Sequence, residues 1–476
     1  MKFDQLFEGG SLDNKISRAK QRSAPMPDVT KFDNRLNVKG HQVFNHAHRE
    51  DKTIYPDPVK DAAGNITSKG EPKVERVNRI GFALQKLVIK RAVSFLFGNA
   101  VTLDYNAETD EEKALIECIE QILEDNKDEF MNRFVAKKVF SYTEAAEYWF
   151  TVDGQEEHED YGFKTNRKLR SVVFSPDKGD KLYPYFDDHG DLVAFSREFT
   201  IKKVNLETTY FETYTDEEFI RWKKSSLSIG DGWVEDHREP IPIKKIPIVY
   251  GCQEEMETED IESIISRLEK MFSNLGDTND YHSAPKIFVN GRILSFGSKG
   301  SSNTVIEGAK DTEAKYLSWD HAPESFVVEA NNLIKMAYTI TQTPDISFDS
   351  VKGIGALSGI ALKLLFLDAH LKVKDKEEIF IPYLQRRYKI IKAYAKEMNK
   401  NGFSKAVKMK IKPVITPYMI ADELQEAQVL QIAAGGKPFI SQLEAVKNWG
   451  GNQDDYDQIV KETKADNTFS MTETTY

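Results

Sequence analysis

Residues 323–376 combine two amphipathic segments with a glycine-bearing loop between them. Pro323 is well suited to the first turn of a helix, because its missing N–H is not needed there. Pro344 ends this first helix, since the residue before a proline is pushed out of helical geometry. Apolar residues recur between the two prolines at helical spacing: Phe326, Val327, Ala330, Leu333, Ile334, Ala337 and Ile340.

A second helix is predicted after the loop. The loop contains Gly353 and Gly355, and Ser358 then offers a hydroxyl as the helix N-cap. We expect the helix to continue to about Asn399 with a kink or break at Pro382, because proline removes a hydrogen bond inside a helix. Its apolar stripe consists of Ile360, Leu364, Leu367 and Leu371.

The segment 258–280 predicts the most regular helix of the chain. Thr258 caps it, and acidic residues fill its first turn, where the helix dipole favours negative charge. Its apolar stripe consists of Ile261, Ile264, Ile265, Leu268, Met271, Phe272 and Leu275. At ~1.5 Å per residue the helix is about 30 Å long, so this stripe must be buried against a partner. The helix after Pro323 is the nearest candidate. A simple helical hairpin is the alternative, but the sequence between the two helices is much longer than hairpins use.

Composition excludes several classes of protein. At 476 residues the chain is expected to form several domains. The mean hydropathy of −0.52 and the lack of a long apolar run favour a soluble protein without a membrane helix or signal peptide. Two cysteines, Cys118 and Cys252, argue against a disulfide scaffold. The net charge of −11 disfavours tight nucleic-acid binding but is compatible with DNA sliding past.

Residues 1–75 are polar and poorly periodic, and we interpret them as an N-terminal arm. His41, His46 and His48 lie close together in this arm. They either bind a metal or belong to a solvated or subunit-bridging segment. The stretch 53–77 predicts a hairpin, because a Gly-Asn turn separates short β-prone runs.

The rest of the chain alternates helical and β-rich regions. Helices are predicted over 78–98, 108–125 and 130–141, with Gly98 as a C-cap. Residues 169–249 are rich in strands. After 399 we expect a strand over 406–416, helices over 417–435, 441–451 and 454–461, and a disordered last dozen residues. Turn aspartates in the β-rich region either bind a metal or, as turns commonly require, accept backbone hydrogen bonds: Asp177, Asp187, Asp188 and Asp191.

The string PDISFDSVKGIGALSGIALK, residues 344–363, resembles the tunnel-loop region of portal proteins from tailed double-stranded DNA bacteriophages. In that family a helix ends at Pro-Asp, a loop follows, and Ser-Gly-x-Ala-Leu-Lys opens the next helix. Segments from Asn78 to Lys461 follow the family's order as well, including the Asn-Arg-Ile run at 78–80 and the Ile-Pro-Ile run before the helix at 258. The matching residues of the helix opening are Ser358, Gly359, Ala361, Leu362 and Lys363.

The resemblance implies an α+β portal fold that assembles as a ring. Its parts would be an N-terminal arm, a wing, a stem of two long helices, a clip, a tunnel loop and a helical crown. The implied ranges are 1–75 for the arm, 76–256 and 359–416 for the wing, 257–281 and 323–343 for the stem, 282–322 for the clip, 344–358 for the tunnel loop and 417–476 for the crown and tail. A clip of ~40 residues is too small to bury a core alone and would need neighbouring copies.

The family implies a homo-oligomeric ring, usually of twelve subunits, at one capsid vertex of the virion. Double-stranded DNA would pass through it during packaging and ejection without sequence-specific binding. The terminase large subunit and the head–tail connector would dock on it, and scaffolding and major capsid proteins would contact the wing. The protein would be made in the host bacterial cytoplasm. No catalytic residue, cofactor or metal is expected.

Three groups of residues are assigned roles by the resemblance. The tunnel-loop residues facing DNA would be Phe348, Asp349, Ser350, Val351, Lys352, Gly353 and Ile354. The basic clip residues facing the terminase would be Lys286, Arg292, Lys299, Lys310 and Lys315. The residues packing the stem would be Ile261, Ile264, Ile265, Leu268, Phe272, Phe326, Leu333 and Ile334.

Alternatives remain at this stage. Lys352 could equally be a solvated loop lysine or part of an intersubunit pair. The GSKGSS run at 297–302 suggests a phosphate loop, but the chain has no G-x-x-x-x-G-K-[ST] pattern. Two other functions are a metal-dependent nuclease built on the turn aspartates and a self-associating adaptor without DNA passage.

Overall fold

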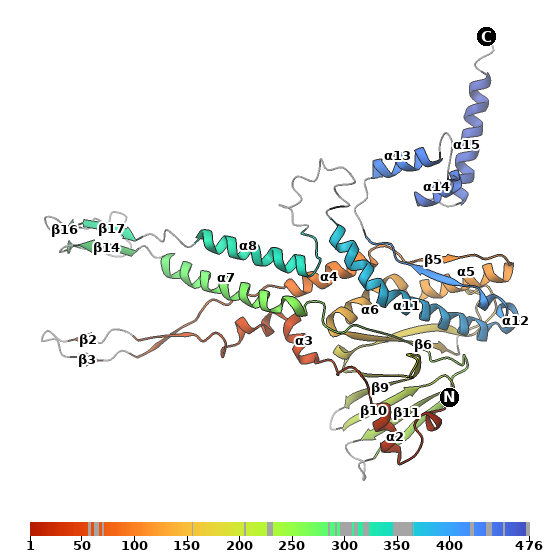
Figure 1. The fold of residues 1–476 in the computed structure, drawn as a ribbon, viewed down its shortest axis with the longest axis horizontal. Helices are drawn as coiled ribbons and strands as arrows, with labels where there is room; N and C mark the ends of the chain where they lie inside the picture. The colour runs from red at the N-terminus through yellow and green to blue at the C-terminus, as the bar shows by residue number, and fades with distance from the viewer. Residues whose placement is uncertain are drawn as a thin grey trace. The chain divides into compact units, whose positions relative to one another are not determined.

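The computed structural model describes residues 1–55, 59–60, 66–68, 71–154, 156–203, 206–225, 232–283, 286–290, 293–295, 307–308, 313–317, 323–345, 364, 366–418, 423–434, 440–450 and 453–472. It divides into two compact units, Met1–Pro344 with Ala369–Tyr418, and Asp345–Asp368 with Met419–Tyr476. Helices and antiparallel strands occur together, as an α+β fold requires (Figure 1).

Two antiparallel sheets form the β-rich part of the first unit. The larger has the order β12-β11-β10-β9-β8, and the smaller has the order β13-β6-β7. This confirms the strand-rich prediction for 169–249. The strands are β6 (Glu144–Val152), β7 (Lys168–Phe174), β8 (Lys181–Phe186), β9 (Leu192–Lys203), β10 (Leu206–Tyr214), β11 (Glu218–Ser225), β12 (Val234–Pro240) and β13 (Ile248–Cys252).

Four longer helices accompany the sheets of the first unit. They are α4 (Leu84–Phe97), α5 (Asp110–Asp125), α6 (Asp128–Tyr142) and α11 (Leu367–Met398). Helix α6 contacts both α4 and β6. The stripe predicted for α5 is buried as expected, at Leu115, Ile116, Ile119 and Ile122.

Helix α11 runs through Pro382 without a break, which corrects the alternative of a broken helix there. Both Pro382 and Glu378, whose carbonyl loses its usual donor, are exposed, so water can satisfy that carbonyl. Phe380, Tyr383 and Leu384 meanwhile hold the helix in the core. The local cost of the proline is thus offset by burial on the opposite side.

Shorter strand pairs complete the first unit. Strand β5 (Thr102–Tyr105) pairs with β18 (Ile411–Val414). The predicted hairpin is confirmed, because β1 (Lys52–Ile54) pairs with β4 (Lys73–Glu75), and β2 (Val59–Lys60) pairs with β3 (Ile66–Ser68). Two further pairs are β14 (Lys286–Asn290) with β17 (Glu313–Leu317), and β15 (Ile293–Ser295) with β16 (Glu307–Gly308).

The N-terminal segment, interpreted as an arm that is solvated or subunit-bridging, contains short helices and packs on the rest of the first unit. It contains α1 (Phe3–Leu6), α2 (Leu12–Ala19), α3 (Val29–Leu36) and two 3-10 turns, η1 (Val38–Gly40) and η2 (Gln42–Phe44). Helices of at most eight residues show too few turns for periodicity to reveal them. An apolar cluster joins the first two helices to the larger sheet: Phe3, Phe7, Ile16, Ala19, Tyr183, Phe211, Ile220 and Trp222.

The second unit is helical where it is described. It contains α13 (Glu423–Ala434), α14 (Gln442–Asn448) and α15 (Gln453–Thr472). The Ser441 hydroxyl caps α14 by accepting the Glu444 N–H at 3.0 Å. Helix α15 extends past the predicted end at 461 and covers most of the segment expected to be disordered, because no proline or glycine interrupts 453–472.

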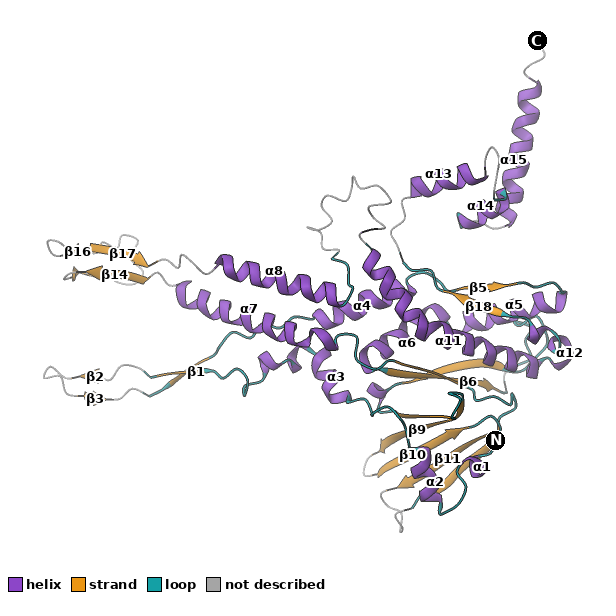
Figure 2. Ribbon diagram, in the orientation of Figure 1, coloured by secondary structure: helices purple, strands orange, loops and turns teal. Residues whose placement is uncertain are grey.

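Helices α7 (Glu262–Ser283) and α8 (Pro323–Ile340) lie side by side in the first unit (Figure 2). A single 3-10 turn, η4 (Glu259–Ile261), leads into α7. Among the helices that the structure describes, none combines the length and apolar composition needed to span a bilayer.

Candidate functional site

The α7–α8 pair is held together by an apolar cluster that also includes Val88 of α4. The Phe272 ring meets Phe82 and Phe326 edge-on, with centroids 5.0 Å apart in both pairs. The eight residues predicted to pack the stem all lie in this cluster or against it: Ile261, Ile264, Ile265, Leu268, Phe272, Phe326, Leu333 and Ile334.

A second side of α7 carries a row of polar acceptors spaced one helical turn apart. Glu269 and Ser273 of this row are buried. The extended segment 78–82 donates every second backbone N–H to the row. The hydrogen bonds are Asn78 to Asp277 at 2.7 Å, Ile80 to Ser273 at 2.9 Å and Phe82 to Glu269 at 2.9 Å. Two extended residues rise about 6.6 Å and four helical residues about 6 Å, so the two spacings match.

This row corrects the predicted start of the helix at 78–98. Helix α4 begins at Leu84, because the preceding N–H groups of Asn78, Ile80 and Phe82 donate to side chains of α7. Gly98, the predicted C-cap, is right-handed at φ −71°, and a Cβ there would lie 2.3 Å from the Ser94 carbonyl oxygen. The i, i+4, i+8 spacing of Glu269, Ser273 and Asp277 was the sequence feature that could have revealed the row.

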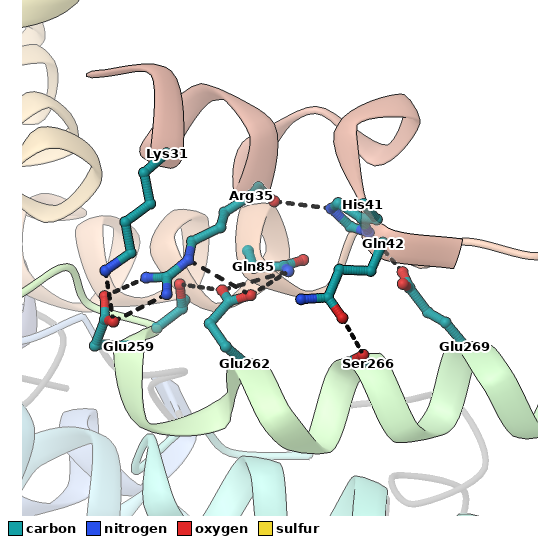
Figure 3. Close-up of polar contacts among 10 residues, drawn as sticks. Lys31, Arg35, His41, Gln42, Gln85, Glu259, Glu262, Ser266 and Glu269 are labelled. Atoms are coloured by element: carbon teal, nitrogen blue, oxygen red, sulfur yellow. Dashed lines mark hydrogen bonds and ion pairs between the residues drawn. The ribbon is translucent and has the colours of Figure 1, made fainter. Parts of the chain in front are cut away.

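Charged side chains of the N-terminal segment contact the same helix and the turn η4 before it. We call the contacts of residues 31–49 with 259–277 the N-terminal seam, and Figure 3 shows its part between Lys31 and Glu269. The Lys31 ammonium lies 3.0 Å from Glu259, and the Arg35 guanidinium makes a two-point contact with the same carboxylate. Arg49 continues the seam at 2.6 Å from Asp277. These contacts join segments more than 200 residues apart in the sequence.

His41 is the buried centre of the seam. Its Nδ1 lies 2.5 Å from Glu269 Oε1 and its Nε2 lies 2.8 Å from the Arg35 carbonyl oxygen. Both ring nitrogens face acceptors, so the doubly protonated imidazolium satisfies the site best. Burial lowers the pKa of His41, but the hydrogen bond and charge of Glu269, aided by Glu262, outweigh it and leave the pKa raised.

The histidines of the N-terminal segment do not converge as a metal site requires. His46 and His48 are exposed, and His46 lies 3.7 Å from Asp51. Within the described residues no group of three or more His, Cys, Asp or Glu side chains is arranged to hold a metal.

The turn aspartates act as turn residues. Asp187 accepts the backbone N–H groups of His189 and Asp191 at 2.9 and 2.8 Å. Asp177 accepts the Ser175 hydroxyl at 2.7 Å and pairs with Lys138. Their carboxylates are thus engaged locally, which fits the turn interpretation.

Helix α8 differs from α7 in presenting apolar side chains to solvent. Val328, Met336 and Ile340 lie in one row at spacings of eight and four residues, with Val327 beside them. Their exposed fractions in this order are 60, 52, 44 and 51 %. Helix α7 is covered by α8 and by the N-terminal segment, whereas this side of α8 is bare within the described part of the chain.

A family model described as phage portal protein, SPP1 Gp6-like, matches residues 19–468. The chain belongs to this family. Phage portal proteins are structural and not enzymatic, and the family assignment confirms the resemblance found at residues 344–363.

Two other comparisons add little to this assignment. The portal chain is similar to a chain of a solved structure titled "Neck of empty GTA particle computed with C6 symmetry". The identity is 10 %, the match covers 77 % of this chain and 88 % of that one, and the TM-score is 0.41. No curated protein matches the sequence.

The other residues assigned from the portal resemblance lie mostly outside the described residues. This holds for the tunnel-loop set, Phe348, Asp349, Ser350, Val351, Lys352, Gly353 and Ile354, and for Arg292, Lys299 and Lys310 of the clip set. Lys286 begins β14, and Lys315 lies in β17 with its ammonium 3.8 Å from Glu313.

Proposed function

We propose that this portal protein assembles into a ring with an open centre at one capsid vertex. Double-stranded DNA passes through the ring during packaging and ejection. The family match over 19–468 supports this function, and the exposed apolar row of α8 is the observation that carries it.

The α8 row supports self-association because exposed apolar patches of this kind mark interaction surfaces. In a ring each α8 meets the adjacent subunit, which covers Val328, Met336 and Ile340. The α7–α8 pair then forms the stem around the channel. The family's usual number of twelve subunits is part of the proposal.

The formal charge of −11 per chain suits a channel for DNA. A ring of like-charged subunits does not retain a polyanion, so DNA slides instead of sticking. Residues 345–357 of the tunnel loop are proposed as the constriction, with Phe348, Val351 and Ile354 toward the bore and Lys352 as a transient phosphate contact. Deleting 349–355 is expected to leave rings intact and to block packaging.

The remaining partners follow from the same proposal. The strands between α7 and α8 form the clip, where Lys286 and Lys315 face the terminase large subunit and later the head–tail connector. The β-rich wing meets scaffolding or major capsid protein. Residues 417–476 form the crown and tail, and the assembled ring resides in the virion.

Electron microscopy with class averaging of the purified protein tests the proposal. Rings of about twelve subunits whose centre admits a duplex are expected, and the single substitution Val328→Asp should abolish them. Lys86→Asn, which makes the same change in charge at an exposed site on α4, should leave them intact.

Two results would contradict the proposal. Filaments, or rings too narrow for a duplex, would favour a structural adaptor without DNA passage. Rings that persist in Val328→Asp would show that α8 does not carry the subunit contact.

A further inference from the structure

A cleft of about 690 Å³ opens in the first unit between the turn that precedes β13 and the middle of α11. Lys244 and Lys245 come from the turn, and Arg386 and Lys389 come from the helix. These four cations line one cleft in a chain whose net charge is −11. Such a local reversal of sign requires an explanation.

The lysines of the cleft are not paired with its aspartates. Lys244, Lys245 and Lys389 are exposed, and their ammonium groups form no ion pair or hydrogen bond with any residue that the structure describes. Arg386 is held in place by donating to the Ile248 carbonyl oxygen at 2.7 Å. The cations are therefore positioned by the fold but not neutralised by it.

The neighbouring cations also repel one another. Burial lowers the pKa of Lys245, and the charges of Lys389, Arg386 and Lys396 lower it further. Burial likewise lowers the pKa of Lys392, with added repulsion from Lys245 and Lys389. Like charges three or four residues apart on one helix destabilise it. The cations of the free protein thus repel one another, and a bound anion would reduce this repulsion.

The remaining lining of the cleft indicates the kind of anion. Tyr185, Leu192, Ile246 and Ile390 provide apolar surface, and Phe186 is 46 % exposed at the cleft. Asp187, Asp188 and Asp216 also line it. A nucleic-acid backbone carries a charge at every phosphate, about 1.7 Å apart along a duplex, and cannot avoid these carboxylates. A polypeptide can place carboxylates on the lysines and apolar side chains on the rest.

We propose that the cleft between the β12–β13 turn and α11 binds an acidic polypeptide segment with interspersed apolar residues. This inference rests on the proposed function in one respect only, namely that the partner is another protein of the virus particle. Attraction between the carboxylates of the peptide and the cations Lys245, Arg386 and Lys389 orients the peptide and speeds its association. Binding weakens as salt screens these exposed charges.

Fluorescence anisotropy with the purified protein tests this inference. The probe is a labelled peptide of alternating glutamate and leucine, and the comparison is a labelled oligothymidylate of equal charge. The peptide should bind at least tenfold more tightly than the oligothymidylate. Lys245→Glu with Lys389→Glu should weaken peptide binding at least tenfold.

The control is Lys86→Glu with Lys90→Glu, which changes the net charge equally at exposed sites on α4. It should leave peptide binding within about twofold of the unmodified protein. Equal weakening in both double variants, oligothymidylate binding as tight as peptide binding, or no peptide binding at all would overturn the proposal. None of these results depends on whether rings form, so failure here is distinguishable from failure of the portal function.

A milder variant protects the test against misfolding. Lys389→Gln removes one cation and its repulsion, so the thermal midpoint of the free protein should rise while peptide affinity falls about threefold. A fall in both quantities would show that Lys389 stabilises the fold and would contradict the inference.

Discussion

Two regions of the first unit use ion pairs to join distant parts of the chain, and they differ in burial. Where α11 crosses β6, Arg387 and Glu147 are both 0 % exposed. In the N-terminal seam, the side chains of Arg35 and Glu259 are 18 and 28 % exposed. The same chemistry therefore operates in a dry core and in a partly solvated contact.

The buried pair belongs to a hydrogen-bond network that converges on Oε2 of Glu147, while Glu147 Oε1 is buried without a hydrogen-bond partner among the described residues. Arg387 donates to Glu147 at 2.7 and 3.1 Å and to Asn132, and the Tyr383 hydroxyl donates to the same carboxylate at 2.9 Å. Desolvation nearly cancels the attraction of such a pair, but removing one partner leaves a charge uncompensated. The core pair fixes the position of α11 on β6 more than it adds net stability. The seam, in contrast, is accessible to solvent, and its stability depends on pH.

Arg387→Ala is expected to have the largest effect. It leaves Glu147 charged in the core, and the free energy of unfolding should fall by about 3–5 kcal/mol, as measured by urea denaturation. Arg35→Ala, the same change in the seam, should cost about 1 kcal/mol, since water can solvate Glu259. Equal losses in the two variants would contradict the distinction between the regions.

A second prediction concerns pH and His41. The raised pKa of His41 means that its stabilising contribution is fully present below pH ~6.5 and is lost as the pH rises through the raised value in the folded protein. Amide hydrogen exchange over residues 31–49, corrected for the intrinsic pH effect, should therefore show weaker protection at pH 9 than at pH 6. Glu269→Gln removes the carboxylate that raises the pKa and should abolish most of this difference. An unchanged difference in Glu269→Gln would assign it to another group.

Apolar stripes that repeat along the sequence could be predicted, whereas hydrogen bonds between segments distant in the sequence could not. Helix α5 and the apolar sides of α7 and α8 were predictable because their stripes extend over several turns. The N-terminal boundary of α4 was not predictable. The helix begins at Leu84 instead of 78 because the residues before it donate their N–H groups to Glu269, Ser273 and Asp277 of α7. The assigned DNA-facing and clip residues depended on the family resemblance, because a portal protein has no catalytic motif.

Lys31→Ala should have the smallest effect, and it tests the more exposed of the two regions, the N-terminal seam. The Lys31 side chain is 46 % exposed, and Glu259 keeps its two-point contact with Arg35 when Lys31 is removed. Exposed ion pairs contribute little because water competes for both charges and salt screens them. The free energy of unfolding should change by less than about 0.5 kcal/mol in urea denaturation. A loss as large as that of Arg35→Ala would mean that the seam is cooperative, with Lys31 ordering α3 before Arg35 can engage, and the seam would then resemble the buried core pair.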